Sequence, residues 1–199
     1  MSGSNLVETE VKLFVPDLAA VAARLDAADA ELESPRVFER NVRYENAPGS
    51  FTGQGVVLRL REDTRVRLTY KEAPRAENGI VSRFEAEVTV DDFDTMDLIL
   101  RRLDFRPYVV YEKYRATYRF GDTEVVLDEM PYGPFVEIEG PPAAIESALA
   151  ALELTVYPRI PLSYLALFER VKAALRLPFD DLTFANFENV TVPPELLYG

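Results

Sequence analysis

The segment Glu8-Thr9-Glu10-Val11-Lys12-Leu13-Phe14 alternates charged and apolar side chains in the pattern of a β-strand. Side chains two positions apart on a strand point to the same side, so Glu8, Glu10 and Lys12 share one face. The valine and the leucine of the segment point to the other face. One side of this strand is therefore suited to an apolar core, and the other carries two carboxylates and an ammonium group.

Seven further segments have the composition and alternation of strands. They are residues 37–45, 56–61, 66–71, 82–90, 108–119, 123–128 and 135–139. Many of their polar faces carry charges of one sign at i and i+2: Arg59 and Arg61, Glu85 and Glu87, Lys113 and Arg115, Glu137 and Glu139. A solvated protein surface usually mixes the two signs. The repeated pairs of like charge therefore indicate a special environment.

Amphipathic helices are predicted over residues 17–32, from Asp94 or Thr95 to 103, and over 141–152 and 163–175. For one strand alone, the usual interpretation of a polar face is contact with solvent. Here the helices must bury their apolar stripes, and the apolar strand faces are the available partners. The charged faces would then turn inward. We expect an α+β fold: a closed eight-stranded antiparallel β-barrel, or tunnel, with helices packed on its outside.

The composition narrows the possible chemistry. The 199-residue chain has a net charge of −12, which argues against nonspecific binding to nucleic acid or to an anionic membrane. It contains no Cys and no His, which excludes thiolate and imidazole metal sites and His-based catalysis. Any metal would be bound by oxygen, as Mg²⁺ and Mn²⁺ prefer. No apolar segment is long enough to span a membrane and the first residues lack a signal-peptide pattern, so we expect a cytoplasmic protein.

The ordered motifs resemble those of the CYTH superfamily, the triphosphate tunnel metalloenzymes. The resemblance covers roughly residues 6–175 and starts with the E-x-E-x-K motif at 8–12. The further matching segments are Leu58-Arg59-Leu60-Arg61, Leu68-Thr69-Tyr70-Lys71, Arg83-Phe84-Glu85-Ala86-Glu87, Lys113-Tyr114-Arg115, Leu127-Asp128, 133–140 and Ser163-Tyr164. We therefore expect one tunnel domain over residues 1–176 and a tail at 177–199 that packs on it.

Three features depart from the family pattern. Asn41 occupies a position that is usually acidic, and Pro161-Leu162 precedes Ser163 where a basic residue is common. The histidine–phenylalanine element that some cyclases carry before the first motif is absent. These departures concern the subfamily and leave the expected fold unchanged.

The resemblance implies a role for each set of charged residues. Glu8, Glu10, Lys12, Glu137 and Glu139 would form the catalytic centre. The metal, Mg²⁺ or Mn²⁺, would be bound by Glu8, Glu10, Glu85, Glu87, Glu137 and Glu139. The triphosphate would be bound by Lys12, Arg59, Arg61, Lys71, Arg83, Lys113 and Arg115. Asp128 would either orient a basic residue or bind metal. Arg67, Arg75, Arg119 and Glu129 lie outside the best matches and are expected at the surface or in a supporting position.

Three functions are compatible with these residues. The first is hydrolysis of inorganic triphosphate, a nucleoside triphosphate or thiamine triphosphate. The second is class IV adenylyl cyclase activity, which converts ATP to cyclic AMP and pyrophosphate. The third is noncatalytic binding of polyphosphate, although the retained Glu-x-Glu pairs argue against it. Hydrolysis is favoured because cyclisation also needs a base and ribose pocket, which no residue identifies. The partner would be a small triphosphate, and the protein a monomer or homodimer.

Overall fold

The computed structural model describes residues 7–198; the outer limits of the expected division, residues 1 and 199, lie outside this range. Within it the chain forms nine strands whose pairings with one another are all antiparallel. They are β1 (Val7–Phe14), β2 (Glu31–Glu45), β3 (Val57–Glu62), β4 (Val66–Lys71), β5 (Arg75–Glu77), β6 (Ile80–Val90), β7 (Arg106–Phe120), β8 (Thr123–Met130) and β9 (Gly133–Glu139).

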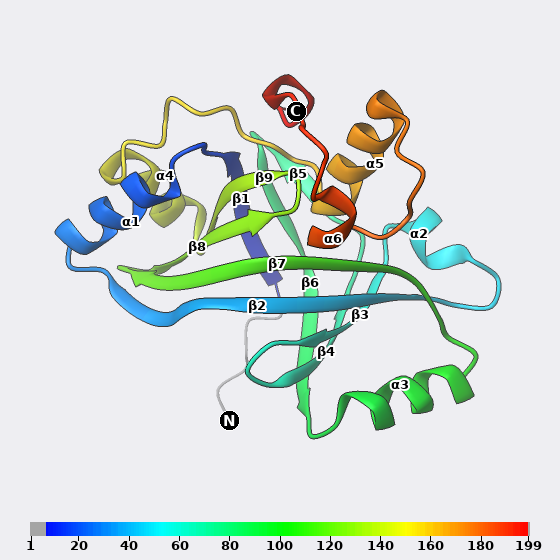
Figure 1. Cartoon of the computed structure of the whole chain (residues 1–199). Coiled ribbons are helices and arrows are strands. Elements are labelled where there is room, and N and C mark those ends of the chain that lie inside the picture. Colours follow the sequence, from blue (N-terminus) through cyan, green and yellow to red (C-terminus); the bar gives the residue numbers. More distant parts are fainter. Residues whose placement is uncertain (1–6, 199) are drawn as a thin grey trace, which may run out of the picture.

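Eight of these strands close into a ring in the order β1-β9-β8-β7-β2-β3-β4-β6 (Figure 1). The ring closes because β6 also pairs with β1, with Glu8 opposite Arg83. The expected closed antiparallel arrangement of eight strands is confirmed. The short strand β5 was not expected; it pairs with β6 outside the ring and is too short to show an alternating pattern.

The first helix is shorter than predicted. Helix α1 (Leu18–Ala27) begins where Asp17 accepts a hydrogen bond from the backbone nitrogen of Ala20 at 2.9 Å, as an N-cap residue does. The predicted extension to residue 32 is wrong, because the chain leaves the helix at Asp29, whose φ of 54° is left-handed. Residues from Glu31 onward already belong to β2, which is irregular around Pro35, a residue without a backbone N–H.

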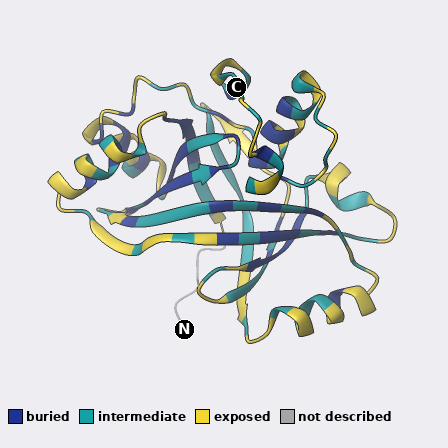
Figure 2. Ribbon diagram, viewed as in Figure 1, coloured by how far each residue is buried: buried dark blue, intermediate teal, exposed yellow. Residues whose placement is uncertain are grey.

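Two helices cover the outside of β1, β9, β8 and part of β7. Helix α1 contributes Val21 and Leu25, and helix α4 (Pro142–Ala151) contributes Ile145 and Leu149. These side chains pack against apolar strand residues such as Ile138, which is fully buried. Figure 2 shows the same division, with buried residues on the strands beneath exposed outer helix surfaces. The apolar faces of the strands therefore point away from the ring axis, as predicted.

Helix α3 (Phe93–Arg102) covers β2 and β3, where Leu100 packs beside Tyr44 and Leu60. It was predicted to begin after Asp94 or Thr95, which is wrong. Its N-cap is Asp92, whose carboxylate accepts a hydrogen bond of 2.7 Å from the backbone of Thr95. A short helix, α2 (Ser50–Gln54), connects β2 to β3.

The C-terminal elements lie over one end of the ring (Figure 1). Helix α5 (Tyr164–Leu175) begins at the N-cap Ser163, as predicted, and helix α6 (Phe184–Phe187) and the 3₁₀ turn η1 (Pro194–Leu196) follow it. Phe168, Leu182 and Leu197 form part of one buried cluster. Leu182 also exchanges backbone hydrogen bonds with β7. No helix among the described residues is both long enough and apolar enough to cross a membrane.

Candidate functional site

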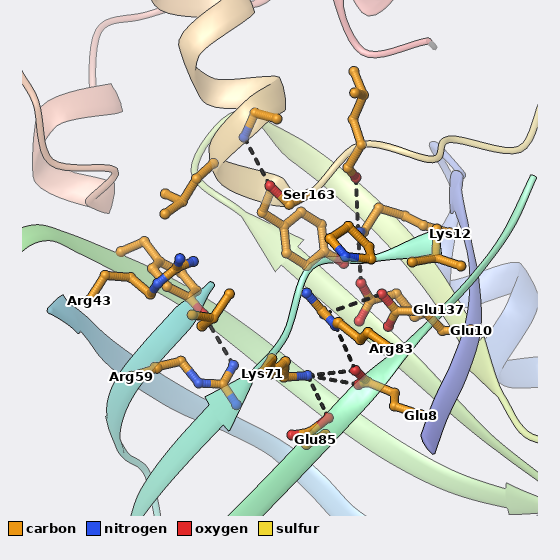
Figure 3. A pocket seen from close by; sticks show the side chains of 18 of the residues that line it. Glu8, Glu10, Lys12, Arg43, Arg59, Lys71, Arg83, Glu85, Glu137 and Ser163 are labelled. Carbon is orange, nitrogen blue, oxygen red and sulfur yellow. Dashed lines mark hydrogen bonds and ion pairs between the residues drawn. The ribbon is translucent and has the colours of Figure 1, made fainter. Parts of the chain in front are cut away.

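The polar faces of the ring strands line a single cavity of about 870 Å³. Every residue assigned to the site from the sequence lines this cavity, and Figure 3 labels several of them, among them Glu8, Lys71 and Glu137. They are Glu8, Glu10, Lys12, Arg59, Arg61, Lys71, Arg83, Glu85, Glu87, Lys113, Arg115, Glu137 and Glu139. A cavity of this size is within the range of small-ligand sites.

Charge is distributed unevenly around the ring. The strands β6, β1, β9 and β8 contribute most of the lining carboxylates, including Glu85, Glu8, Glu137 and Glu124. The strands β7, β2, β3 and β4 contribute mainly cations: Arg115 and Lys113, Arg43, Arg59 and Arg61, and Arg67 and Lys71. Because these strands are consecutive in each half of the ring, the cavity has an acidic half and a basic half.

Glu8 is bonded to cations on two neighbouring strands. Lys71 donates to both carboxylate oxygens of Glu8 at 2.8 Å, and Nε of Arg83 donates to one of them at 3.0 Å. Burial raises the pKa of Glu8, but the charges of Lys71 and Arg83 outweigh it and bring the pKa to about 2. Lys71 also pairs with Glu85 at 2.7 Å. Glu8 is therefore an ionised carboxylate shared between two cations.

Glu137 is held in a similar way on β9. The ammonium of Lys12 lies 3.1 Å from one of its oxygens, and Arg115 donates to the other at 2.7 Å. Burial acts against its ionised form, but Lys12, Arg115 and Lys113 lower its pKa well below the ordinary value. Lys12 also lies over the ring of Tyr164, 4.3 Å from its centroid.

Asp128 is fully buried and accepts hydrogen bonds from three side chains. Arg115 donates to it at 2.7 and 2.5 Å, Lys113 at 3.0 Å and the hydroxyl of Tyr164 at 2.7 Å. These contacts fix the two cations of β7 relative to the first residue of α5. Of the two roles left open for Asp128, its contacts favour orienting basic residues.

Sequence reasoning missed an acidic residue in the basic half. Glu39 on β2 is 2% exposed and lies 3.4 Å from Arg61 and 3.6 Å from Lys113. Burial raises its pKa, but Lys113 and Arg61 lower it further, so the net direction is downward. The alternation of β2 could have indicated that 39, 41 and 43 share a face. This segment departs from the family pattern, so the motifs did not indicate Glu39.

The cavity also contains carboxylates that lack sufficient counter-charge. Glu10 on β1 lies directly opposite Glu139 on β9, which in turn lies opposite Glu124 on β8. Burial and Glu137 raise the pKa of Glu10. Desolvation, Glu8, Glu124 and Glu10 raise the pKa of Glu139 to about 8; because Glu139 is an exposed residue at the end of β9, we attribute the direction mainly to its acidic neighbours. Like charges directly opposite each other across strands are destabilising, so this row favours an added cation.

The carboxylate row fits a hard divalent metal in its donor chemistry, because Mg²⁺ and Mn²⁺ prefer oxygen ligands. No three acidic side chains among residues 7–198 already converge as a ligand set. Glu8 and Glu137 bond to cations instead. Metal binding would thus require carboxylates to exchange ammonium or guanidinium partners for the metal.

Arg67, Arg43 and Tyr111 are among the lining residues that were not assigned to the site from the sequence. Arg67 was expected at the surface or in a supporting position, but it lines the cavity and lies 3.8 Å from Glu87. Arg43 and Tyr111 line the basic half and were not singled out. Tyr111 precedes Lys113 by two residues on β7, so the strand period alone could have found it.

Comparison with known proteins identifies the class to which this architecture belongs. The CYTH domain family matches residues 6–157. The chain belongs to this family, and the matched residues include all the strands of the ring.

Individual proteins of known name or structure are also similar to this chain. A protein of Methanocaldococcus jannaschii named "Putative adenylate cyclase" is 26% identical over 136 residues, which cover 67% of this chain and 77% of the relative. A Pyrococcus horikoshii structure, PH1819, is 26% identical with a TM-score of 0.66, covering 81% of this chain and 98% of that one. A Hippeastrum protein described as a putative adenylyl cyclase with "a dominant triphophatase activity" shares the fold at 22% identity, with a TM-score of 0.61 over 81% and 95% of the two chains.

Proposed function

We propose that this protein is a divalent-metal-dependent hydrolase of a triphosphate: inorganic triphosphate, a nucleoside triphosphate or thiamine triphosphate. The observation that carries the proposal is the division of one cavity into an acidic and a basic half. A phosphate chain needs cations along one side, and a divalent metal needs carboxylates on the other. Membership of the CYTH family and the activity described for the Hippeastrum protein support this choice.

In this proposal, the phosphate oxygens bind to Arg59, Arg61, Lys71, Lys113 and Arg115, and also to Lys12 and Arg83, two cations that lie on strands of the acidic half. Most of these cations already bond to carboxylates, as Arg59 does to Glu87 at 3.6 Å. An incoming phosphate would replace such partners. Because the cations are already buried, phosphate binding would not require a further loss of their hydration. Asp128 and Tyr164 keep Lys113 and Arg115 in position during the exchange. Preoriented charges of this kind stabilise the charge that develops in phosphoryl transfer.

The carboxylates that would bind the metal are Glu8, Glu10, Glu137 and Glu139, with Glu85 and Glu87 in support. When bound, Mg²⁺ or Mn²⁺ neutralises phosphate charge and polarises a nucleophile. Glu10 and Glu139 are the strongest candidates: Glu10 has one long ion pair, with Arg83 at 3.7 Å, Glu139 has none among residues 7–198, and burial and acidic neighbours raise the pKa of both. The chain itself contributes anchoring of the phosphates and a cavity walled by protein on the sides of the ring.

The adenylyl cyclase alternative is supported by the names of two similar proteins, the Methanocaldococcus jannaschii relative and the Hippeastrum protein, both of which are called putative adenylate or adenylyl cyclases. In that reaction the 3′-hydroxyl of ATP attacks the α-phosphate and pyrophosphate leaves. The same phosphate-binding cations would serve both reactions, and the difference would lie in how the nucleoside is bound. A noncatalytic polyphosphate-binding module would use the basic half alone and leave the carboxylate row without a role.

The experiment supplies purified protein with tripolyphosphate, ATP or thiamine triphosphate, with Mg²⁺, Mn²⁺ or EDTA, and separates the products. Orthophosphate release that requires a metal, without cyclic AMP, is the expected result. Cyclic AMP and pyrophosphate from ATP would replace the hydrolase by the cyclase. Binding of tripolyphosphate without turnover in either metal would favour the noncatalytic module.

A further inference from the structure

Arg43 is a partly buried cation of the cavity that has no acidic partner among residues 7–198; of the other lining cations only the exposed Arg65 shares this property there. It lies on β2 directly opposite Arg59 on β3, so two arginines form a cross-strand pair of like charge. Eight other lining cations each form an ion pair with a carboxylate: Lys71, Arg83, Lys12, Arg115, Lys113, Arg61, Arg59 and Arg67. Arg43 forms none with the acidic residues of the described range, and its buried Nε has no hydrogen-bond acceptor there.

The other neighbours of Arg43 do not neutralise it. The ring of Tyr108 has its centroid 5.9 Å from the guanidinium, which is at the outer limit of a cation–π contact. Burial lowers the pKa of Arg43, and the nearby charges of Arg59 and Arg83 act in the same direction. Two like charges directly opposite on adjacent strands are destabilising. A bound anion would therefore stabilise this pair of arginines.

Tyr111 adds a hydrogen-bond donor beside this pair. Its oxygen accepts a hydrogen bond of 3.2 Å from Nη1 of Arg59, and this is its one hydrogen bond within residues 7–198. Because a phenol can donate and accept at the same time, the hydroxyl hydrogen remains free for another acceptor. The residue is buried and lines the cavity.

A second unsatisfied side chain lies in the next row of the same strands. Asn41 on β2 is fully buried, opposite Tyr111 on β7 and Arg61 on β3, and neither its amide oxygen nor its amide nitrogen has a partner in the described structure. Unpaired buried amide groups cost free energy and are rare in folded proteins. Arg43, Tyr111 and Asn41 thus each have a hydrogen-bond donor without an acceptor among the described residues, and all three lie on β2 or directly opposite it.

We propose that Arg43, Arg59 and the hydroxyl of Tyr111 form a phosphoryl-binding subsite that does not require a divalent metal. Arginine forks match the geometry of phosphate oxygens, and the phenol supplies a further donor. The carboxylate row is not part of this subsite, so an anion can bind here in the absence of a metal. The phosphoryl group can belong to the substrate or be free orthophosphate; its assignment to the substrate rests on the proposed triphosphatase function.

The first test measures binding without metal. Wild-type protein, Arg43→Gln and Arg102→Gln are titrated with orthophosphate and with tripolyphosphate by calorimetry in EDTA. Arg102 is exposed on α3, away from the cavity, and serves as the matched control. We expect binding by wild type and Arg102→Gln, and at least about a tenfold weaker affinity in Arg43→Gln, since one arginine fork is lost. Affinities of Arg43→Gln within twofold of wild type, or no metal-free binding by wild type, would overturn the subsite.

Folding and the source of the phosphoryl group are checked separately. Arg43→Gln removes a like-charge contact, so its melting temperature without ligand should not fall; if that variant does not fold, Tyr111→Phe takes its place in the same titration. If the subsite binds a phosphoryl group of the substrate, Arg43→Gln has a higher KM for tripolyphosphate than wild type. If it binds free orthophosphate, Arg43→Gln has an unchanged KM but is no longer inhibited by the orthophosphate product. Metal-free, Arg43-dependent binding without any hydrolysis would leave the subsite standing and overturn the proposed hydrolase. Hydrolysis with unchanged binding in Arg43→Gln would do the reverse.

Discussion

Glu10 and Glu139 lie directly opposite each other on the antiparallel strands β1 and β9, and both side chains line the cavity. This pairing joins the first and the last of the Glu-x-Glu motifs, which are 129 positions apart in the chain (139 minus 10). The fold tolerates two facing carboxylates where cross-strand charges usually differ in sign. In the proposed function, a metal ion bound by the two carboxylates would offset their repulsion.

The pair predicts opposite effects of one substitution on activity and on stability. Glu10→Gln should lower metal-dependent hydrolysis by about 100-fold or more, because a ligand is lost. The melting temperature without metal should stay the same or rise, because burial and Glu137 already disfavour the ionised form of Glu10. Initial rates and thermal unfolding of the two proteins measure both effects.

The control for this substitution is Glu195→Gln, at an exposed position of η1 outside the cavity. It should leave rates and melting temperature unchanged. Near-wild-type rates in Glu10→Gln would remove Glu10 from the proposed metal site, and a large drop in melting temperature would show that its charge stabilises the fold.

The raised pKa of Glu139 predicts how stability depends on pH. Its pKa in the folded chain, about 8, is above the ordinary value of 4.5, so the folded state holds this proton more tightly than the unfolded state. The resulting stabilisation is fully present below pH 4.5 and is lost as pH rises through about 8. Urea unfolding without metal should therefore show less stability at pH 9 than at pH 6, and Glu139→Gln should reduce the difference.

Saturating Mg²⁺ should also reduce this difference, because the metal binds the ionised carboxylate. Metal binding near pH 7 should release protons, which calorimetry in two buffers of different ionisation enthalpy detects. A stability difference that is the same in wild type and Glu139→Gln would contradict the account of this residue.

The sequence predicted the ring and most of its lining, because strand alternation and the ordered motifs depend only on local spacing. The i, i+2 pattern correctly assigned Arg59 and Arg61, and Glu137 and Glu139, to the inward faces. It could not predict which charges meet, since ion pairs such as Lys71 with Glu8 join residues 63 positions apart through strand register. It missed Glu39 and Arg43 because the motif pattern of that segment differs from the family's, and Glu124 because the residue two positions later, Val126, carries no charge.

Glu39 predicts a stability effect that a ligand should repair. Glu39→Gln removes a buried charge and leaves Arg61 and Lys113 with less compensation. Breaking a buried ion pair in this way costs about 3 kcal/mol. Urea denaturation should show this loss, and saturating tripolyphosphate should stabilise Glu39→Gln more than wild type. An unchanged midpoint would show that Glu39 does not balance these cations.

Tyr164 predicts a smaller effect through Asp128. Tyr164→Phe deletes the 2.7 Å hydrogen bond to the buried carboxylate but leaves the bonds from Lys113 and Arg115. A hydrogen bond to a charged group contributes about 1.5–3 kcal/mol, so the free energy of unfolding should fall by an amount in that range. The KM for tripolyphosphate should rise because the two cations are held less firmly. Leu165→Ala, a neighbour on α5 without a polar contact, separates loss of the hydrogen bond from general loosening of the helix.

The most direct measurement is a crystal structure of the protein with Mn²⁺ and tripolyphosphate, using anomalous scattering to locate the metal. The account predicts a manganese peak bonded to carboxylates of β1 and β9, and phosphate density against Arg59, Arg61 and Lys113 inside the ring. Metal and phosphate bound only on the outer surface, with the inward carboxylates still paired to the same cations, would contradict it.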